Sequence, residues 1–255
     1  MRSSPFAAAT ILIFAGCGAE PAATPRAPVG DGARDDFVIE QAAPTAEPAP
    51  DATPVPKTKR WQTARVLQRT ALRASPGGRV VAHLGTRTEF GSRRVLAVTG
   101  RRRGWLRVIA SERANGRPGW IRARSARLGA TAISIHVDRS RRRLTLRRGK
   151  RVLRRLPVAV GRAGNETPLG RFAVTDRLRT QSDDSPYGCC AVALSGHQTK
   201  LVPGWPGGDR LAVHGTPNPE TVGRPASLGC MRAHTDDIRA LMRAVPLGAP
   251  VFIRA

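Results

Sequence analysis

Residues 211–232 read LAVHGTPNPETVGRPASLGCMR, a stretch in which a histidine and a cysteine stand 16 positions apart. His214 follows three apolar residues, a pattern typical of the end of a buried strand. A cysteine and a histidine on separate strands can meet in space and supply a thiol nucleophile with its base. Taken alone, this spacing favours a buried, unreactive thiol over a catalytic one.

The chemistry of such a pair depends on the groups around the thiol. A free cysteine has a pKa of about 8.5, so at neutral pH the thiolate needs a neighbouring imidazole, and His214 is the nearest candidate. Gly229 leaves room beside Cys230 for a substrate carbonyl, and the backbone N–H groups of residues 228–230 can hold the oxyanion that forms on it. The stretch is therefore compatible with acyl transfer through Cys230.

Four separated strings make this interpretation specific. They are His214-Gly215-Thr216, Val222-Gly223-Arg224-Pro225, Ser227-Leu228-Gly229-Cys230-Met231-Arg232 and, upstream, Thr167-Pro168-Leu169-Gly170-Arg171-Phe172. In this order and at this spacing they resemble the L,D-transpeptidases of the YkuD family, over about residues 131–255. The resemblance implies Cys230 as nucleophile, His214 as general base and the Gly215 main-chain carbonyl as the group that orients the imidazole.

The resemblance also implies which residues bind substrate. Those expected to hold the oxyanion or the substrate are Ser227, Leu228, Gly229, Arg232, Thr216, His197 and Tyr187. Leu228 differs from the family, which most often has histidine at this position. A side-chain role at position 228 is therefore in doubt, whereas its backbone N–H is unaffected.

The reaction implied by the resemblance is peptidoglycan cross-linking. Cys230 would attack a tetrapeptide donor stem, release its terminal D-amino acid and hold the acyl group as a thioester until a diamino-acid side chain accepts it, which gives 3→3 cross-links. An L,D-carboxypeptidase with water as acceptor and a non-catalytic cell-wall-binding lipoprotein are the alternatives. Peptidoglycan stem peptides are the expected partners, and no cofactor or metal is expected.

Short segments predict a mainly β fold for residues 131–255. Residues 133–137 and 143–146 alternate apolar and polar side chains, as half-buried strands do, and 157–160, 171–174 and 250–253 add further strands. Residues 147–150 predict a hairpin turn. One helix is predicted from Thr235 or Asp236 to Val245, before Pro246. With the resemblance, this predicts a β-sandwich-like catalytic domain with one or two short helices.

Residues 61–128 contain a second group of short strands, at 65–67, 79–84, 94–98 and 104–109, with turn signals between them. Closely spaced strands of this kind predict a small barrel. The pairs Gly104-Trp105 and Gly119-Trp120 resemble those of bacterial SH3-like domains, in which the tryptophans are buried. That resemblance implies a domain that binds the cell wall.

Positive charge is the unusual feature of the composition. The 255 residues carry a formal net charge of +25, and residues 61–128 alone hold 16 basic and 2 acidic side chains. Such a field favours polyanions, so anionic cell-wall polymers are expected as further partners; the alternative is an arginine-rich solvated surface without a ligand. Nucleic acid is not expected, because no nucleic-acid-binding motif or series of exposed aromatic residues accompanies the charge.

The N-terminal region predicts export. Residues 1–16 resemble a bacterial lipoprotein signal peptide, whose cleavage would leave Cys17 as the lipidated residue; a plain signal peptide is the alternative. Residues 17–60 are rich in alanine, proline and acidic residues, which predicts a disordered tether. The protein is therefore expected outside the cytoplasm, anchored by lipid to the cell membrane or secreted into the cell wall or periplasm.

Two further cysteines, Cys189 and Cys190, are adjacent in the chain. Three states are open for them: two buried unpaired thiols, which we favour, a disulfide between the two neighbours, or a bond from one of them to a cysteine elsewhere. A zinc ribbon is not expected, because no pair of cysteines has the CxxC spacing.

Overall fold

The computed structural model describes residues 59–204 and 208–255. The predicted signal peptide, Cys17 and nearly all of the predicted tether lie outside these residues. The described chain is mainly β with a single α-helix, which confirms the predicted fold class. No helix among the described residues is long and apolar enough to cross a membrane.

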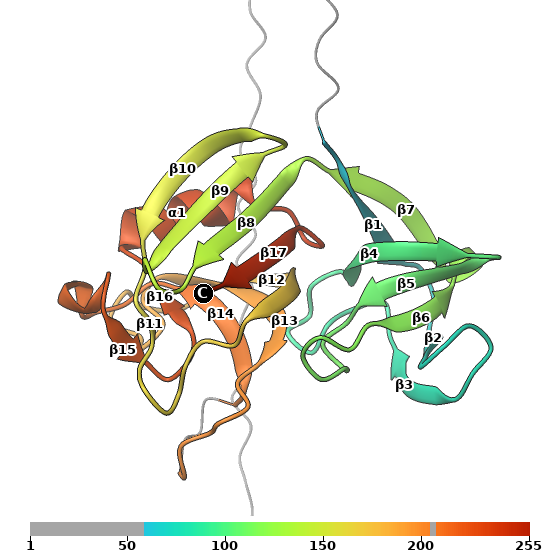
Figure 1. The fold of residues 1–255 in the computed structure, drawn as a ribbon, viewed down its shortest axis with the longest axis horizontal. Helices are drawn as coiled ribbons and strands as arrows, with labels where there is room; N and C mark the ends of the chain where they lie inside the picture. Colours follow the sequence, from blue (N-terminus) through green and yellow to red (C-terminus); the bar gives the residue numbers. More distant parts are fainter. Residues whose placement is uncertain (1–58, 205–207) are drawn as a thin grey trace, which may run out of the picture. The chain divides into compact units, whose positions relative to one another are not determined.

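Residues 61–131 form an antiparallel sheet of seven strands. In chain order these are β1 (Trp61–Val66), β2 (Thr70–Arg73), β3 (Val80–Leu84), β4 (Val95–Arg102), β5 (Trp105–Ile109), β6 (Gly119–Arg122) and β7 (Ala126–Thr131), with a 3-10 turn at Ala123–Ser125. They lie side by side in the order β3-β2-β6-β5-β4-β1-β7 (Figure 1). Leu72, Leu84, Leu106 and Ile121 are fully buried and form the centre of its core.

The boundary of this sheet and the burial of its tryptophans can be compared with what the sequence predicts. Residues 129 and 130, which fall between the two segments predicted as domains, belong to β7, which pairs with the whole of β1. Trp105 is buried, and the guanidinium of Arg122 lies 4.0 Å from its ring centroid, whereas Trp120 is only half-buried. The assignment of this segment as an SH3-like domain stays a prediction.

Residues 133–254 form a mixed sheet of eight strands. They are β8 (Ile133–Asp138), β9 (Arg143–Arg148), β10 (Arg151–Pro157), β12 (Gly170–Arg179), β13 (Cys190–His197), β14 (Arg210–His214), β16 (Met231–Arg232) and β17 (Pro250–Arg254), in the order β10-β9-β8-β17-β12-β13-β14-β16. A short parallel pair joins β11 (Val160–Gly161) to β15 (Pro225–Ser227). A 3-10 turn occupies Pro219–Thr221.

Local sequence signals explain much of this sheet. Ile135 and Val137 of β8 and Leu144 of β9 are fully buried, as their alternation predicts. β9 ends at Arg148 and β10 begins at Arg151, so the predicted hairpin turn is present. Gly149 in that turn has φ +59°, a left-handed conformation that glycine adopts without a steric penalty.

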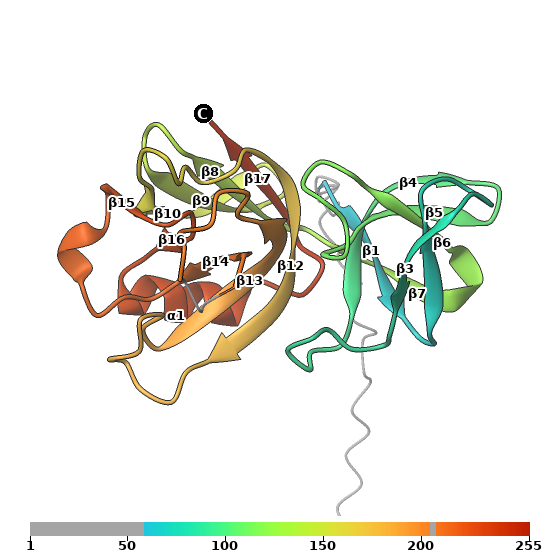
Figure 2. The ribbon, with the colours of Figure 1, turned by 90° about the horizontal axis from the view of Figure 1, so that it is seen from below.

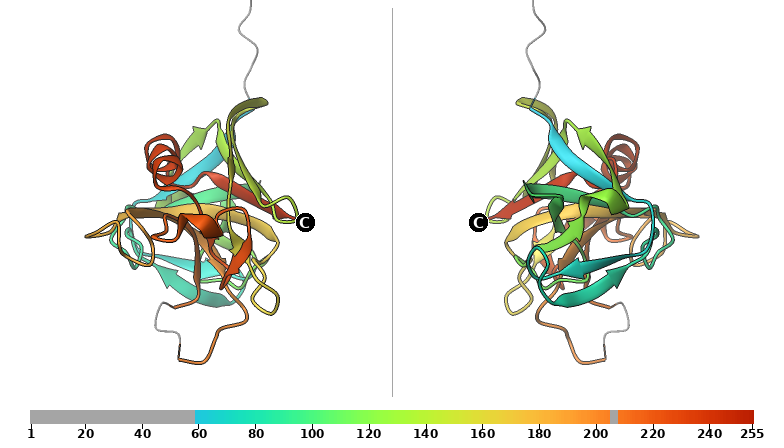
Figure 3. Two further views of the ribbon diagram at one scale, coloured as in Figure 1. Left: turned by 90° about the vertical axis from the view of Figure 1, so that its left-hand side faces the viewer. Right: turned by 90° about the vertical axis from the view of Figure 1, so that its right-hand side faces the viewer.

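The helix α1 (Thr235–Ala244) packs against one face of the sheet through Ile238 and Leu241, both fully buried (Figures 2 and 3). The N-cap residue of α1 is His234, one residue before Thr235, the earlier of the two positions predicted from the sequence. No side chain forms a capping hydrogen bond at this end of the helix. Thr235 is already helical because the first intrahelical bond runs from the Ile238 N–H to the His234 carbonyl. Asp236 and Asp237 lie in the first turn, where negative charge suits the helix dipole.

Candidate active site

A cleft of about 190 Å³ contains both Cys230 and His214 in its lining. The two residues lie next to each other in the sheet because β14, which ends at His214, pairs in parallel with β16, which begins just after Cys230. The remaining residues of the lining are Pro186, Tyr187, Gln198, Lys200, Leu201, Val202, Gly208, Asp209, Arg210, Ser227, Leu228 and Arg232. The structure therefore brings the predicted nucleophile and base to one cavity.

His214 is almost completely buried, with 4% of its surface exposed. Its Nδ1 lies 2.6 Å from the carbonyl oxygen of Gly215. Because a carbonyl can only accept, Nδ1 carries the proton and Nε2 is left as an acceptor. Burial lowers the pKa of His214 to about 4, an effect that the bond to Gly215 opposes and the charge of Arg232 reinforces. At neutral pH the imidazole is therefore neutral and able to accept a proton.

Gly215 is held in place by the backbone around the adjacent cysteines. Its N–H donates to the carbonyl of Cys190 over 3.1 Å. A Cβ on Gly188 would lie 2.6 Å from the carbonyl carbon of Gly215, so only glycine permits this close approach. The chain before β13 thus supports the carbonyl that orients His214.

Cys189 and Cys190 form a disulfide between neighbouring residues. The favoured prediction, two unpaired thiols, is therefore wrong, and the second of the open alternatives is observed. Cys190 is buried and Cys189 partly so, and the turn before β13 places their side chains next to each other. Cys230 remains the only free cysteine among the residues that the structure describes.

The thiol of Cys230 is partly exposed and lines the cleft. Its S–H donates to the main-chain carbonyl of Arg210, with a distance of 3.6 Å between Sγ and oxygen. Burial raises the pKa of Cys230, while a hydrogen bond with the Ala212 backbone and the charge of Arg232 oppose that effect. The resting pair is thus a neutral thiol beside a neutral imidazole, and the thiol proton has to be transferred before or during attack.

Hydrogen bonds fix the turn that carries Cys230. The hydroxyl of Ser227 donates to the Cys230 carbonyl over 2.5 Å and accepts from the Gly229 N–H over 3.1 Å. From the other side, the fully buried hydroxyl of Thr167 donates to the Gly229 carbonyl over 2.8 Å and accepts from the Gly161 N–H over 2.9 Å. The first residue of the upstream string therefore supports the turn before the cysteine.

The sequence indicates that Gly229 leaves room for a substrate carbonyl, whereas the structure shows a different need for glycine at this position. Its φ is +121°, and a Cβ there would lie 2.1 Å from Nε2 of Gln198. The space above Gly229 is thus occupied by the Gln198 amide, which donates to the carbonyls of Leu228 (2.8 Å) and Asn165 (3.1 Å). Glycine permits close packing of the turn against β13 and the loop after it.

Thr167→Val is expected to destabilise the protein and slow any reaction of Cys230. Valine keeps the shape but removes the hydroxyl, so two buried backbone groups lose their partner; we expect a loss of about 1–3 kcal/mol in the free energy of unfolding. Urea denaturation measures it. Thr221→Val is the matched control, because the Thr221 hydroxyl donates to the Asn218 carbonyl in an exposed turn and makes no other hydrogen bond within the described residues 59–204 and 208–255. Equal effects of the two variants would contradict the role given to Thr167.

The other predicted site residues fall into two groups. Leu228 and Arg232 line the cleft, as does Tyr187, whose ring stands edge-on to His214 with 5.1 Å between centroids. Burial raises the pKa of Tyr187, and the negative charge that Cys230 carries once it is ionised raises it further. Thr216 is not part of the lining: it is buried, and its hydroxyl accepts from the Asn218 N–H over 3.1 Å.

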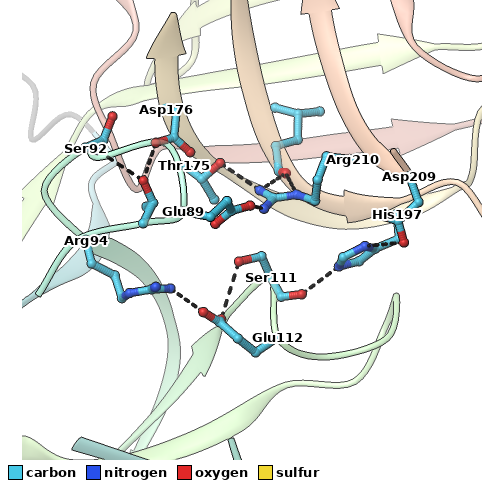
Figure 4. A network of polar contacts seen from close by, with 12 residues as sticks. Glu89, Ser92, Arg94, Ser111, Glu112, Thr175, Asp176, His197, Asp209 and Arg210 are labelled. Atoms are coloured by element: carbon cyan, nitrogen blue, oxygen red, sulfur yellow. Dashed lines mark hydrogen bonds and ion pairs between the residues drawn. The ribbon is translucent and has the colours of Figure 1, made fainter. Parts of the chain in front are cut away.

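His197 does not line the cleft either. Its Nδ1 lies 2.9 Å from a carboxylate oxygen of Asp209, and its Nε2 lies 2.6 Å from the carbonyl oxygen of Ser111, which follows β5 (Figure 4). Asn115 exchanges two hydrogen bonds with the His197 backbone, over 2.7 and 2.9 Å. With both ring nitrogens engaged, His197 links β13 to the N-terminal sheet, and its position does not support the predicted contact with substrate.

Arg210, missed by sequence reasoning, connects the same N-terminal sheet to the thiol. Its guanidinium pairs with Glu89, and it also donates to Thr175 Oγ1 over 2.9 Å (Figure 4). Its own carbonyl accepts the S–H of Cys230. The residue has no motif of its own, so the only signal in the sequence is its place four residues before His214 on the same strand.

Gln198 and Lys200 are further lining residues that the sequence analysis does not single out. The amide of Gln198 organises the turn before Cys230, and Lys200 adds a positive charge to the cleft, paired with Glu166 over 3.2 Å. Among the described residues, no group of three or more histidine, cysteine or acidic side chains is arranged to hold a metal ion. The cleft is thus a cationic cavity around a thiol and its base.

Two relatives from Bacillus subtilis match part of this chain. The YkuD protein of Bacillus subtilis (strain 168), provisionally named an L,D-transpeptidase, is 33% identical over 119 residues, which are 47% of this chain and 64% of the relative. The YqjB protein of the same organism, with the same provisional name, is 30% identical over 106 residues, 38% of this chain and 56% of the relative. The matched part is less than two thirds of the length of either protein.

Solved structures are similar to a comparable part of the chain. An L,D-transpeptidase from Mycobacterium tuberculosis H37Rv is 20% identical, covers 53% of this chain and 64% of its own, and has a TM-score of 0.41. One from Mycobacterium smegmatis is 17% identical, covers 55% and 75%, and has a TM-score of 0.38. Residues 132–253, the segment that carries His214 and Cys230, match the model of the YkuD family, which is described as the L,D-transpeptidase catalytic domain.

Proposed function

We propose that this protein is an L,D-transpeptidase that cross-links peptidoglycan through a thioester on Cys230. The observation that carries the proposal is one cleft with a free thiol and a neutral, oriented imidazole, inside the segment that matches the YkuD model. A protein that only bound the cell wall would have no need of a buried, neutral imidazole in the same cleft as a free thiol.

The first step is acylation of Cys230. Nε2 of His214 accepts the S–H proton while Sγ attacks the carbonyl carbon of the donor stem. The amide bond to the terminal D-amino acid breaks, and the imidazolium returns the proton to the leaving amine. We assign the oxyanion to the N–H groups of Leu228 and Cys230, because the Gly229 N–H already donates to Ser227.

The second step releases the product. The acceptor amine attacks the thioester carbon and its proton passes to Nε2 of His214. The C–S bond then breaks, and the imidazolium returns the proton to Sγ, which regenerates the thiol. We propose a tetrapeptide stem as donor and the side-chain amine of a diamino acid as acceptor, so that the product is a 3→3 cross-link. Arg232 and Lys200, both in the lining, suit the carboxylates of such peptides.

Product analysis tests this proposal. Purified full-length protein is incubated with tetrapeptide muropeptides, and the products are separated and weighed by mass spectrometry. A cross-linked dimer with loss of one terminal amino acid per link is the expected result. Tripeptide monomers with free amino acid, and no dimer, would instead identify an L,D-carboxypeptidase, and unchanged tetrapeptide would contradict both enzymatic readings.

We further propose that the protein acts outside the cytoplasm, held at the membrane by lipid on Cys17. The support lies in the sequence alone, in the apolar segment and the small residues before Cys17. In membrane fractionation the wild type is expected in the membrane fraction and Cys17→Ala in the soluble fraction. An equal distribution of both would contradict lipidation.

A further inference from the structure

A second cavity, also of about 190 Å³, lies between the loop that joins β5 to β6 and strand β12. Four arginines line it: Arg107 on β5, Arg113 and Arg117 on the loop, and Arg171 on β12. The lining contains no carboxylate and shares no residue with the lining of the Cys230 cleft. It is therefore a separate, strongly cationic site.

Two arginines of this cavity carry a buried N–H donor that has no hydrogen-bond partner among the described residues. These donors are the Nε atoms of Arg113 and Arg171. None of the ion pairs between described residues includes any of the four arginines. Arg94 contrasts with them, since this buried arginine pairs with Glu112 over 2.5 Å. Buried donors without partners are costly, and an oxyanion would satisfy them.

The walls of the cavity are held in place by other parts of the fold. Arg171 lies over two aromatic rings, 5.6 Å from the centroid of Trp61 and 5.5 Å from that of Phe252. The loop is fixed by Asn115, which exchanges two hydrogen bonds with the backbone of His197. Burial, and then the charge of Arg107, lower the pKa of Arg171, as expected where positive charges are crowded. The site is therefore formed before any ligand arrives.

We propose that this arginine pocket binds a phosphoryl group. Guanidinium groups match phosphate oxygens in paired hydrogen bonds, and a phosphate offers more acceptor oxygens and, as a monoester or free ion, more negative charge than a carboxylate. The volume is below the range of about 300–1,000 Å³ typical of whole-ligand sites, which suits one phosphoryl group rather than a large molecule. The phosphate belongs to an anionic polymer or is free in solution, and the experiment distinguishes these sources.

Calorimetric titration of the full-length protein tests the proposal. Three probes are used at constant ionic strength: inorganic phosphate, an oligomer of glycerol phosphate, and acetate. Saturable binding of a phosphate probe is expected, and Arg113→Gln or Arg171→Gln should weaken it by about tenfold or more, because a charge-assisted hydrogen bond is lost. Tighter binding of the oligomer than of inorganic phosphate would identify the polymer as the source. Tighter binding of inorganic phosphate would identify the free ion.

Arg155→Gln is the matched control, since Arg155 is an exposed residue of β10 that takes part in no ion pair between described residues and loses the same charge. It should leave the affinity unchanged within about twofold. If Arg155→Gln weakened the affinity for phosphate as much as the pocket variants do, the phosphate would be attracted diffusely by the net charge of +25. That result would overturn the proposed site. Absence of saturable phosphate binding, or acetate binding as tight as phosphate, would also overturn the proposal. Should Arg171→Gln fail to fold, Arg113→Gln, on the loop, still decides.

Discussion

Cys230→Ala is expected to abolish acyl-enzyme formation and turnover completely. No other free thiol exists among the described residues, and alanine cannot form the thioester that conserves the energy of the donor amide. Intact mass spectrometry measures the effect after incubation with a tetrapeptide stem or with a carbapenem. The wild type should gain the mass of one acyl group and the variant none.

A control variant makes this result decisive. A Cys189→Ala, Cys190→Ala double variant removes the disulfide but leaves Cys230, and it should still form the adduct. Because the bond that supports Gly215 comes from the Cys190 main chain, this variant keeps the groups that orient His214. Adduct mass on Cys189 or Cys190, or turnover by Cys230→Ala, would refute the assignment of the nucleophile.

His214→Gln is expected to slow acylation by about a hundredfold to ten-thousandfold, the usual contribution of a positioned acid–base group. Glutamine fills a similar space but cannot accept the thiol proton. The thiol should remain present and able to react with iodoacetamide, which shows that Cys230 is intact and accessible, and an unchanged circular dichroism spectrum shows that the variant is folded. Single-turnover acylation rates measure the effect, and a loss below about threefold would rule out His214 as the base.

The pH dependence of acylation follows from the protonation states of His214 and Cys230. Burial lowers the pKa of His214 to about 4 and raises the pKa of Cys230. The imidazole is protonated only below about pH 4, so acylation should rise as the pH increases through that value and then stay level through neutral pH. Alkylation of Cys230 by iodoacetamide should be slow at pH 6. Its rate should increase only at pH values above those at which an ordinary cysteine thiol ionises. Rapid alkylation that is independent of pH between 5 and 8 would indicate a thiolate–imidazolium pair and contradict this account.

Local patterns in the sequence were enough to predict several elements of the fold. Alternation at 133–137 and 143–146 predicted β8 and β9, because successive side chains of a strand point to opposite faces of a sheet. The helix was found within one residue, since Ile238 and Leu241 have the spacing of a buried helical face. His214 and Cys230 were also singled out as the candidate pair that the structure brings to one cleft, because their types and flanking strings lie within 22 residues of chain.

Only the tertiary structure decided which distant groups support this pair. Thr167 bonds to Gly229, 62 residues away, and Gln198 bonds to Leu228, 30 residues away, contacts that no local spacing encodes. The resemblance implied a substrate role for His197, yet the loop after β5 engages its ring. The arginine pocket arises in the same way, since β5, the following loop and β12 contribute its charges. Periodicity indicates which face of an element is buried, whereas the partner that covers the face depends on how strands far apart in the chain pack together.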